Sequence, residues 1–272
     1  MTKERPSFPL KLDALDNKKS LANRPSSSVV SLSQDKNSNP LKSAPQIVDS
    51  ASGVGLDSAT VREHMVKKLA HQGVADNAVL SAMLNVERHR FVDTALVNQA
   101  YEDTSLPIGL GQTISKPNVV ARMIELLRQG RCLDARGKLG RVLEIGTGCG
   151  YQAAVLSQLA SEVYSIERLK GLYERAKENL RPLRVPNLHL LFGDGMLGYA
   201  KGAPYSAIIA AAGGENIPEH WLEQLALGGR IVAPVETQSR TQVLLVVDKT
   251  ENGFEKTYLE AVHFVPLKSG IN

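Results

Sequence analysis

Hydrophobic residues recur at helical spacing in the chain after its first 57 residues. Val61, Met65 and Leu69 lie four residues apart, which places them on one face of a helix. A second pattern of this kind spans residues 79–84 and follows Asp76, a residue type that caps helix N-termini. Both segments therefore predict short amphipathic helices that pack one face on a core.

From residue 141 onward, short apolar runs alternate with helical patterns. The expected strands are RVLEIG (141–146), EVYSIE (162–167), NLHLLFGD (187–194), YSAIIAAA (205–212) and GRIVAPV (229–235), and the expected helices lie near 151–159, 171–183 and 218–226. Strands that alternate with helices form a parallel, doubly wound sheet. Two final apolar runs, 242–250 and 254–267, flank Asn252-Gly253 and predict an antiparallel edge on that sheet. We therefore expect an α/β, Rossmann-like fold with helical N-terminal elements and an antiparallel C-terminal edge.

Residues 1–56 differ from the rest in composition. They are rich in Ser, Pro, Asn and Lys, and Phe8 is their one aromatic residue. Such a segment buries too little apolar surface to offset the entropy lost on ordering. We predict a disordered, low-complexity tail over 1–56 and one domain over 57–272, with Asp57 or Ser58 capping its first helix.

Charge and cysteine content narrow the setting. The net charge is +4, but both signs are spread along the chain, and no basic cluster suggests a phosphate backbone as partner. Cys132 and Cys149 form no disulfide framework and are typical of reduced thiols. No apolar run is long enough to span a membrane, and no apolar segment of a secretory signal follows Lys3 and Arg5. The histidines show no metal-ligand spacing. We expect a cytoplasmic monomer without a metal, nucleic-acid or membrane partner.

The strongest chemical signal is the segment VLEIGTGCG, residues 142–150. A buried strand containing Glu144 runs into three alternating glycines, which permit a sharp turn and close approach of a ligand. Glu167 ends the next strand about 20 residues later, the spacing at which a Rossmann-like unit places a carboxylate against ribose hydroxyls. Asp194 and Gly195 follow the third strand, where an aspartate can accept a hydrogen bond from an adenine amino group. All three strand ends are expected to meet in one crevice.

Two cofactors compete for this geometry. A dinucleotide site typically has G-x-G-x-x-G, with a helix N-terminus facing the pyrophosphate. This chain has G-x-G-x-G, and the Glu144 carboxylate beside it would repel a pyrophosphate. It suits the ammonium and sulfonium of S-adenosyl-L-methionine, whose product is S-adenosyl-L-homocysteine. A dinucleotide site and a glycine-rich turn without ligand stay open as alternatives.

The segment LPIGLGQTISKP, residues 106–117, precedes a helical pattern over 117–130. Ser115, before Lys116 and Pro117, has the form of a helix N-cap with proline at the first helical position. The same position lies at a helix N-terminus, which favours an anion. We therefore predict that Ser115 is both a structural cap and a residue facing a bound anion.

Six segments, LPIGLGQTISKP, VLEIGTGCGYQAAVLSQL, VYSIER, GDG, GGRIVAPV and VHFVPL, together and in this order resemble the protein-L-isoaspartate O-methyltransferase family from about Met65 to Leu267. The resemblance implies transfer of the methyl group of S-adenosylmethionine to the free α-carboxylate of L-isoaspartyl residues in damaged proteins and peptides, which starts repair through a succinimide. It implies an acceptor site at Thr113, Ile114 and Ser115, with Ser115 as the catalytic residue. Beside Glu144, it implies cofactor positions at Gly146, Thr147, Gly148, Gly150, Glu167, Asp194 and Gly195. A small-molecule methyltransferase and a non-catalytic adaptor that recognises damaged proteins are the alternatives.

Several positions depart from the pattern of that family. Glu87 stands where a proline is usual, Ser206 where an aspartate is usual, Lys116 where a glutamine is frequent, and Glu236 where a glycine is typical. Ala-Ala-Gly-Gly at 211–214 replaces Ala-Ala-Pro. We expect Lys116, Glu236 and the 211–214 segment to lie near the crevice, so acceptor preference is the property they put in question.

Overall fold

The computed structural model describes residues 59–272, so the predicted tail over 1–56 and the caps Asp57 and Ser58 lie outside the described residues. The helices are α1 (Ala59–His71), α2 (Asn77–Asn85), α3 (Pro117–Arg128), α4 (Tyr151–Leu159), α5 (Lys170–Leu180) and α6 (Glu219–Gln224). The strands are β1 (Leu106–Gly109), β2 (Gln112–Ile114), β3 (Leu139–Ile145), β4 (Ala160–Glu167), β5 (Leu188–Phe192), β6 (Tyr205–Ala210), β7 (Leu225–Glu236), β8 (Gln242–Thr250) and β9 (Gly253–Ala261). Within this part of the chain, no helix has both the length and the apolar character needed to cross a membrane.

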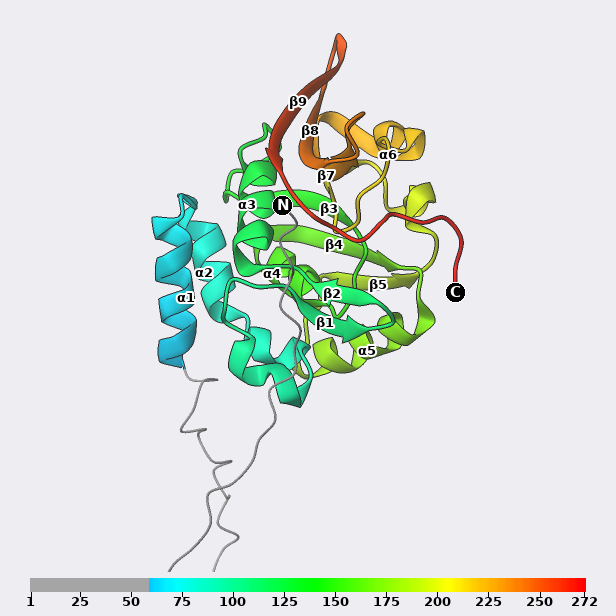
Figure 1. The fold of residues 1–272 in the computed structure, drawn as a ribbon. Helices are drawn as coiled ribbons and strands as arrows, with labels where there is room; N and C mark the ends of the chain where they lie inside the picture. Colours follow the sequence, from blue (N-terminus) through cyan, green and yellow to red (C-terminus); the bar gives the residue numbers. More distant parts are fainter. Residues whose placement is uncertain (1–58) are drawn as a thin grey trace, which may run out of the picture. The chain divides into compact units, whose positions relative to one another are not determined.

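The main sheet has seven strands in the order β5-β4-β3-β6-β7-β8-β9. The five strands β5, β4, β3, β6 and β7 run parallel to one another. β8 pairs antiparallel with β7, and β9 pairs antiparallel with β8 at the edge of the sheet; the predicted Asn252-Gly253 turn joins β8 to β9 (Figure 1). The predicted doubly wound sheet with an antiparallel C-terminal edge is therefore confirmed. The strand order reverses between β3 and β6, which makes their carboxyl ends the expected place for a ligand.

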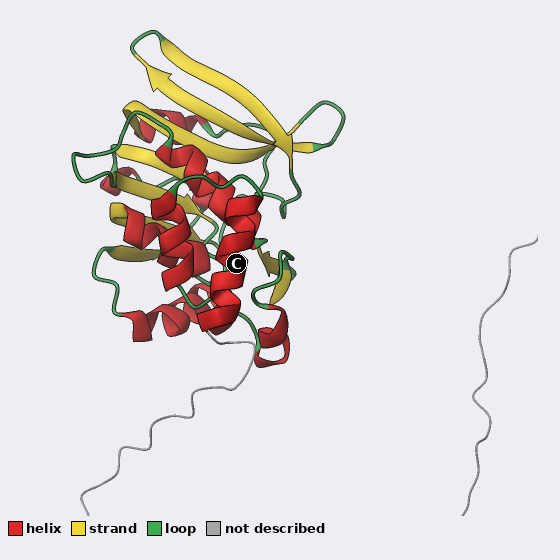
Figure 2. Ribbon diagram, turned by 90° about the vertical axis from the view of Figure 1, so that its left-hand side faces the viewer, coloured by secondary structure: helices red, strands yellow, loops and turns green. Residues whose placement is uncertain are grey.

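Both faces of the central strands are buried, and successive residues of a strand contribute to the core on opposite faces. Val142 and Ile209 belong to the core beneath α3, α4 and α5, whereas Leu143 and Ile208 belong to the core on the side of α6. Figure 2 shows helices packed against the strands of the sheet. Trp221 anchors α6 in the core on its own side of the sheet. Its indole N–H donates to the Gly195 carbonyl at 2.8 Å, which ties α6 to the turn after β5.

The N-terminal helices form where the hydrophobic pattern predicts them. α1 buries Met65 and Leu69, and α2 buries Val79 among others. The predicted cap Asp76 accepts hydrogen bonds from the Ala78 and Val79 N–H groups. α1 and α2 pack on α3 and α4 and so complete the helical layer on that side of the sheet.

The segment before α3 differs from the prediction. Residues 106–114 form the hairpin β1–β2, and the N-cap of α3 is Lys116, so the prediction that Ser115 caps this helix is wrong. The reason is Pro117 at the first helical position: a residue before proline is excluded from the helical region, which leaves Lys116 extended (ψ 143°) as the boundary. The carboxylate at this helix end is that of Asp103, which accepts the Asn118 N–H at 3.0 Å.

Candidate active site

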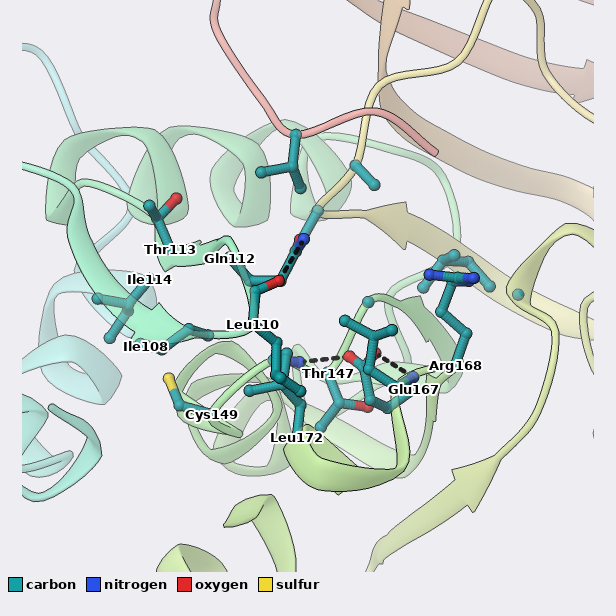
Figure 3. A pocket seen from close by; sticks show the side chains of 18 of the residues that line it. Ile108, Leu110, Gln112, Thr113, Ile114, Thr147, Cys149, Glu167, Arg168 and Leu172 are labelled. Carbon is teal, nitrogen blue, oxygen red and sulfur yellow. Dashed lines mark hydrogen bonds between the residues drawn. The ribbon is translucent and has the colours of Figure 1, made fainter. Parts of the chain in front are cut away.

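A cavity of about 450 Å³ opens at the carboxyl ends of β3, β4 and β6. Its wall has four parts: the hairpin with the residue after it (Ile108, Leu110–Ser115), the glycine turn (Ile145–Cys149, Tyr151, Gln152), the strand ends and turns (Ile166–Leu169, Leu172, Gly195, Ala211, Ala212) and the C-terminal segment (Val265–Lys268, Asn272), with Val120 of α3. Figure 3 shows Thr113 and Ile114 on the hairpin side and Glu167 and Arg168 across the cavity from them. The cavity thus brings the predicted cofactor side and the predicted acceptor side together.

The hairpin is held over the cavity by α5. Its tip has three consecutive residues with positive φ, Gly109, Leu110 and Gly111, so the flanking glycines let the chain reverse where only Leu110 bears the strain. Arg175 of α5 donates to the Ile108 carbonyl at 2.8 Å and pairs with Asp93 at 2.7 Å. These contacts fix the height of the hairpin above the glycine turn.

The glycine turn uses its own N–H groups internally. The Gly146 and Thr147 N–H groups donate to the Ile166 carbonyl at 2.9 and 3.1 Å, and the Gly148 N–H donates to the Glu167 carboxylate at 2.9 Å. These three donors are therefore not free to hold a pyrophosphate, which disfavours the dinucleotide alternative. Gly146 and Gly148 have φ of 90° and 58°, values that L side chains rarely adopt.

Glu167 lies on the cavity wall at the end of β4, as predicted. The Gly148 and Leu169 N–H groups each donate to one of its carboxylate oxygens at 2.9 Å, so the buried side chain is held in one orientation. A carboxylate has about four lone-pair positions, and the two that remain can accept ribose hydroxyls. Arg168, which follows it, also lines the cavity (Figure 3).

Glu144 is not among the residues that line the cavity. Its side chain is fully buried in the sheet, and burial raises the pKa of the carboxyl group to about 8. The Ser165 hydroxyl donates to this carboxyl group and lies 2.6 Å from the Thr147 hydroxyl, whose residue does line the cavity. Glu144 therefore reaches the cavity through Ser165 and Thr147. The sequence pattern did not single out Ser165; only the β3–β4 register, which pairs it with Glu144, identifies it.

Two further predicted cofactor residues lie behind the wall. Asp194 accepts the Met196 N–H at 2.9 Å and the Gly270 N–H at 2.6 Å, while its neighbour Gly195 lines the cavity. Gly150 is the N-cap of α4 with φ of 92°, and an added Cβ there would lie 2.8 Å from a leucine of α5. Gly150 thus shapes the turn rather than the cavity surface.

The predicted acceptor residues Thr113, Ile114 and Ser115 all line the cavity. A second cavity of about 290 Å³, the outer cavity, adjoins it and shares Thr113, Ser115, Ala211 and Val265. Lys116 lines this outer cavity.

Of the other departures from the family pattern, Ala211 and Ala212 line the main cavity, as expected, whereas Glu236 and Ser206 do not. Glu236 is exposed and lines neither cavity, so its predicted proximity to the crevice is not what the structure shows. Ser206 lies at the amino end of β6, where its hydroxyl donates to the Arg141 carbonyl at 3.0 Å. Both cavities lie at the opposite, carboxyl ends of the strands.

The C-terminal segment closes one side of the cavity, and sequence analysis missed this. It runs as a parallel bridge beside Gly213, with the Leu267 N–H donating to the Gly213 carbonyl at 2.7 Å. Farther on, the Arg168 side chain donates to the Gly270 carbonyl at 2.8 Å, and the Asn272 N–H donates to the Arg168 carbonyl at 2.8 Å. These bonds fix residues 270–272 beside the end of β4 and the start of α5 (Figure 1). The segment VHFVPL contributes to the resemblance, but no local pattern reveals that it crosses the carboxyl ends of the strands.

Comparison with known proteins places the chain in a described family. Residues 59–272 match the model of the family described as protein-L-isoaspartate(D-aspartate) O-methyltransferase. A protein-L-isoaspartate O-methyltransferase of Methylibium petroleiphilum is 61% identical over 80% of this chain and 81% of its own length, and that of Burkholderia thailandensis is 57% identical over 85% and 69%.

Solved structures agree with these matches. A structure described as a protein-L-isoaspartate O-methyltransferase is similar with a TM-score of 0.68 at 29% identity, covering 77% of this chain and 67% of that chain. A Plasmodium falciparum protein described by the same activity, in complex with S-adenosyl-L-homocysteine, has a TM-score of 0.64 at 26% identity and covers 76% and 98%.

Proposed function

The chain belongs to the protein-L-isoaspartate(D-aspartate) O-methyltransferase family, and from this we propose how its own residues carry out the reaction. The protein is an S-adenosylmethionine-dependent protein carboxyl O-methyltransferase. It methylates the free α-carboxylate of L-isoaspartyl residues in damaged proteins and peptides and so starts their repair through a succinimide. The assignment of roles to individual residues below is our proposal.

The observation that carries the assignment is the continuity of the cavity. One side has the glycine turn and the fixed Glu167 carboxylate, and the other has the Thr113 and Ser115 residues of the acceptor loop. A cofactor on the first side and a carboxylate on the second share one space, whose wall includes buried apolar residues such as Ile108 and Ile114. This arrangement suits direct transfer between two bound molecules.

The cofactor side fits S-adenosylmethionine by the chemistry of its groups. We assign Glu167 to the ribose hydroxyls, and Gly146, Thr147 and Gly148 to the methionine part that lies against the turn. Gly195 is assigned to the adenine side, where an added Cβ would lie 2.5 Å from Ile145 Cγ2. Glu144, Gly150 and Asp194 act from behind this surface, by holding the residues that form it.

The acceptor side needs few catalytic groups. S-adenosylmethionine, when bound, supplies a methyl group on a sulfonium that is already activated. An acceptor carboxylate oxygen forms a bond to the methyl carbon as the carbon–sulfur bond breaks and its electron pair goes to sulfur, so no proton moves and no base is required. We propose that the Thr113 and Ser115 hydroxyls orient the carboxylate while Ile114 excludes water. Strong ion pairing at this point would stabilise the ground state and slow the transfer.

The decisive experiment measures methyl transfer from labelled S-adenosylmethionine to a peptide containing L-isoaspartate and to its normal L-aspartate twin. The family reaction requires labelling of the isoaspartyl peptide alone. Labelling of small carboxylic acids in preference to it would support a small-molecule methyltransferase. Tight binding of the isoaspartyl peptide without labelling would support the adaptor alternative.

Ser115→Ala tests the assignment at the acceptor side. We expect turnover on the isoaspartyl peptide to fall while binding of S-adenosylhomocysteine, measured by calorimetry, is retained. Ser161→Ala is the matched control, because Ser161 is exposed at the amino end of β4. A loss of stability of about 1 kcal/mol with unchanged turnover per folded molecule would instead support a purely structural serine.

We further propose that the enzyme acts as a cytoplasmic monomer and binds neither nucleic acid nor membrane. The spread of both charge signs along the chain and the pair of unpaired cysteines support this. Light scattering after size-exclusion chromatography tests the oligomeric state. Binding to anionic vesicles tests the membrane, and retention on a DNA column tests nucleic acid, both at physiological salt.

A further inference from the structure

The outer cavity is where an acceptor peptide has to continue. It shares Thr113, Ser115, Ala211 and Val265 with the main cavity, and these include the residues to which we assign the acceptor carboxylate. The isoaspartyl residue carries this free carboxylate, and its peptide chain continues through the amino group and the side-chain carbonyl. Since an extended chain advances about 3.3 Å per residue, the neighbouring residues come within reach of the outer cavity. The residues that line this cavity therefore meet the neighbours of the isoaspartate.

The lining of the outer cavity contains a cation and no carboxylate. Its titratable or charged members are Lys116 and His263, both exposed. The other lining residues are apolar or carry a hydroxyl group. A peptide side chain in this space thus meets the Lys116 ammonium without a competing acid on the wall.

The acids near the outer cavity are already engaged. Asp103 accepts the Asn118 N–H at 3.0 Å, and Glu260 pairs with Arg122 at 3.0 Å. Across residues 59–272, Lys116 takes part in none of the ion pairs that the structure forms. Its ammonium therefore remains available to a bound chain.

The backbone of Lys116 is fixed although its side chain is exposed. It is the N-cap of α3, its carbonyl accepts the Val120 N–H at 3.1 Å, and Pro117 restricts it from the other side. The start of the side chain is thereby fixed beside the cavity, while its flexible end can follow different peptides.

We propose that Lys116 is a specificity-determining residue that favours acceptor peptides with an acidic side chain next to the isoaspartyl residue. The inference rests on the proposed acceptor site at Thr113 and Ser115. An exposed ion pair contributes about 0.2–1 kcal/mol, so the expected preference for glutamate over lysine is at most about fivefold in kcat/KM. It resides in KM, because the flanking charge is the same before and during methyl transfer.

The test uses isoaspartyl peptides with Glu, Gln or Lys placed either before or after the isoaspartate. Their kcat and KM are measured for the wild type, Lys116→Gln, Lys116→Arg and Lys201→Gln. Lys201 is exposed and lines neither cavity. Because Lys201→Gln removes the same charge as Lys116→Gln, it controls for the net charge of the protein. The Arg variant keeps the cation with a different head group.

On at least one side of the isoaspartate, we expect a Glu:Lys ratio of kcat/KM of about two to five for wild type and Lys201→Gln. The ratio falls to near one in Lys116→Gln, is kept in Lys116→Arg, and shrinks in high salt. An equal ratio in wild type and Lys116→Gln overturns the inference while the family reaction stands. If the wild type methylates none of the isoaspartyl peptides, the proposed acceptor site itself is overturned.

Discussion

The buried carboxyl group of Glu144 makes the free energy of unfolding depend on pH, and one substitution removes this dependence. Burial raises its pKa in the folded protein from 4.5 to about 8, because the charged form loses its hydration in the sheet. The Ser165 and Gln152 side chains beside it favour the charged form, but burial outweighs them, so the neutral acid is the favoured form. Glu144→Gln replaces that acid by a neutral group of the same shape that still accepts the Ser165 hydroxyl.

The sign follows from the order of the two pKa values. Between pH 4.5 and about 8 the unfolded chain has released this proton and the folded chain has not, so stability falls as pH rises. Each pH unit in that window lowers the free energy of unfolding by about 1.4 kcal/mol, and the whole window by at most about 5 kcal/mol. Glu144→Gln removes this loss, so its advantage over the wild type grows from pH 6 to pH 8 and then levels off.

The assay is urea denaturation of wild type and Glu144→Gln at pH 6, 7, 8 and 9. We expect the difference in unfolding free energy to increase by about 2 kcal/mol between pH 6 and pH 8. Glu125→Gln is the matched control: Glu125 is also buried, but it accepts the Ala75 N–H at 2.6 Å and pairs with Arg122 at 3.2 Å. Removing that charge lowers stability at pH 7. A difference for Glu144→Gln that does not vary with pH would refute the reasoning.

Three further substitutions test how the site is held. Gly150→Ala should lower the free energy of unfolding by about 2 kcal/mol more than Gly137→Ala, because both glycines have positive φ but only the first meets a side chain at 2.8 Å; equal losses in urea would contradict this. Arg175→Ala should lower kcat/KM for the isoaspartyl peptide about tenfold while calorimetry shows S-adenosylhomocysteine still bound, because only the hairpin loses its support; an equal loss of both would contradict it. Asp194→Ala should weaken S-adenosylhomocysteine binding at least tenfold in calorimetry, because Gly270 and the C-terminal segment lose their anchor; unchanged affinity would show that the segment does not need it.

Local patterns were enough for most of the fold. Helical spacing of Met65 and Leu69 and the cap Asp76 set the first helices, and the alternation of apolar runs with helices from residue 141 set the parallel sheet. These signals are local, since a residue's periodicity and capping depend on neighbours within a few positions. The hairpin β1–β2 escaped detection because its strands are only four and three residues long.

The candidate site divides in the same way. The glycine turn and Glu167 follow from strand ends and spacing, and the structure brings them to one cavity with Thr113 and Ser115. The sequence pattern could not show that the Glu144 side chain contacts Ser165 and does not line the cavity. That depends on which residue of β4 lies beside Glu144 in the sheet.

The sequence by itself determined the fold class and the glycine turn, because each is encoded by residues close together in the chain. Only the tertiary structure decided that the C-terminal segment lines the cavity, that Asp194 accepts the Gly270 N–H, and that Lys116 lines the outer cavity. Asp194 and Gly270 are separated by 76 positions. Contacts of this kind arise from strand order and loop closure, to which many distant residues contribute together, and no short pattern records them.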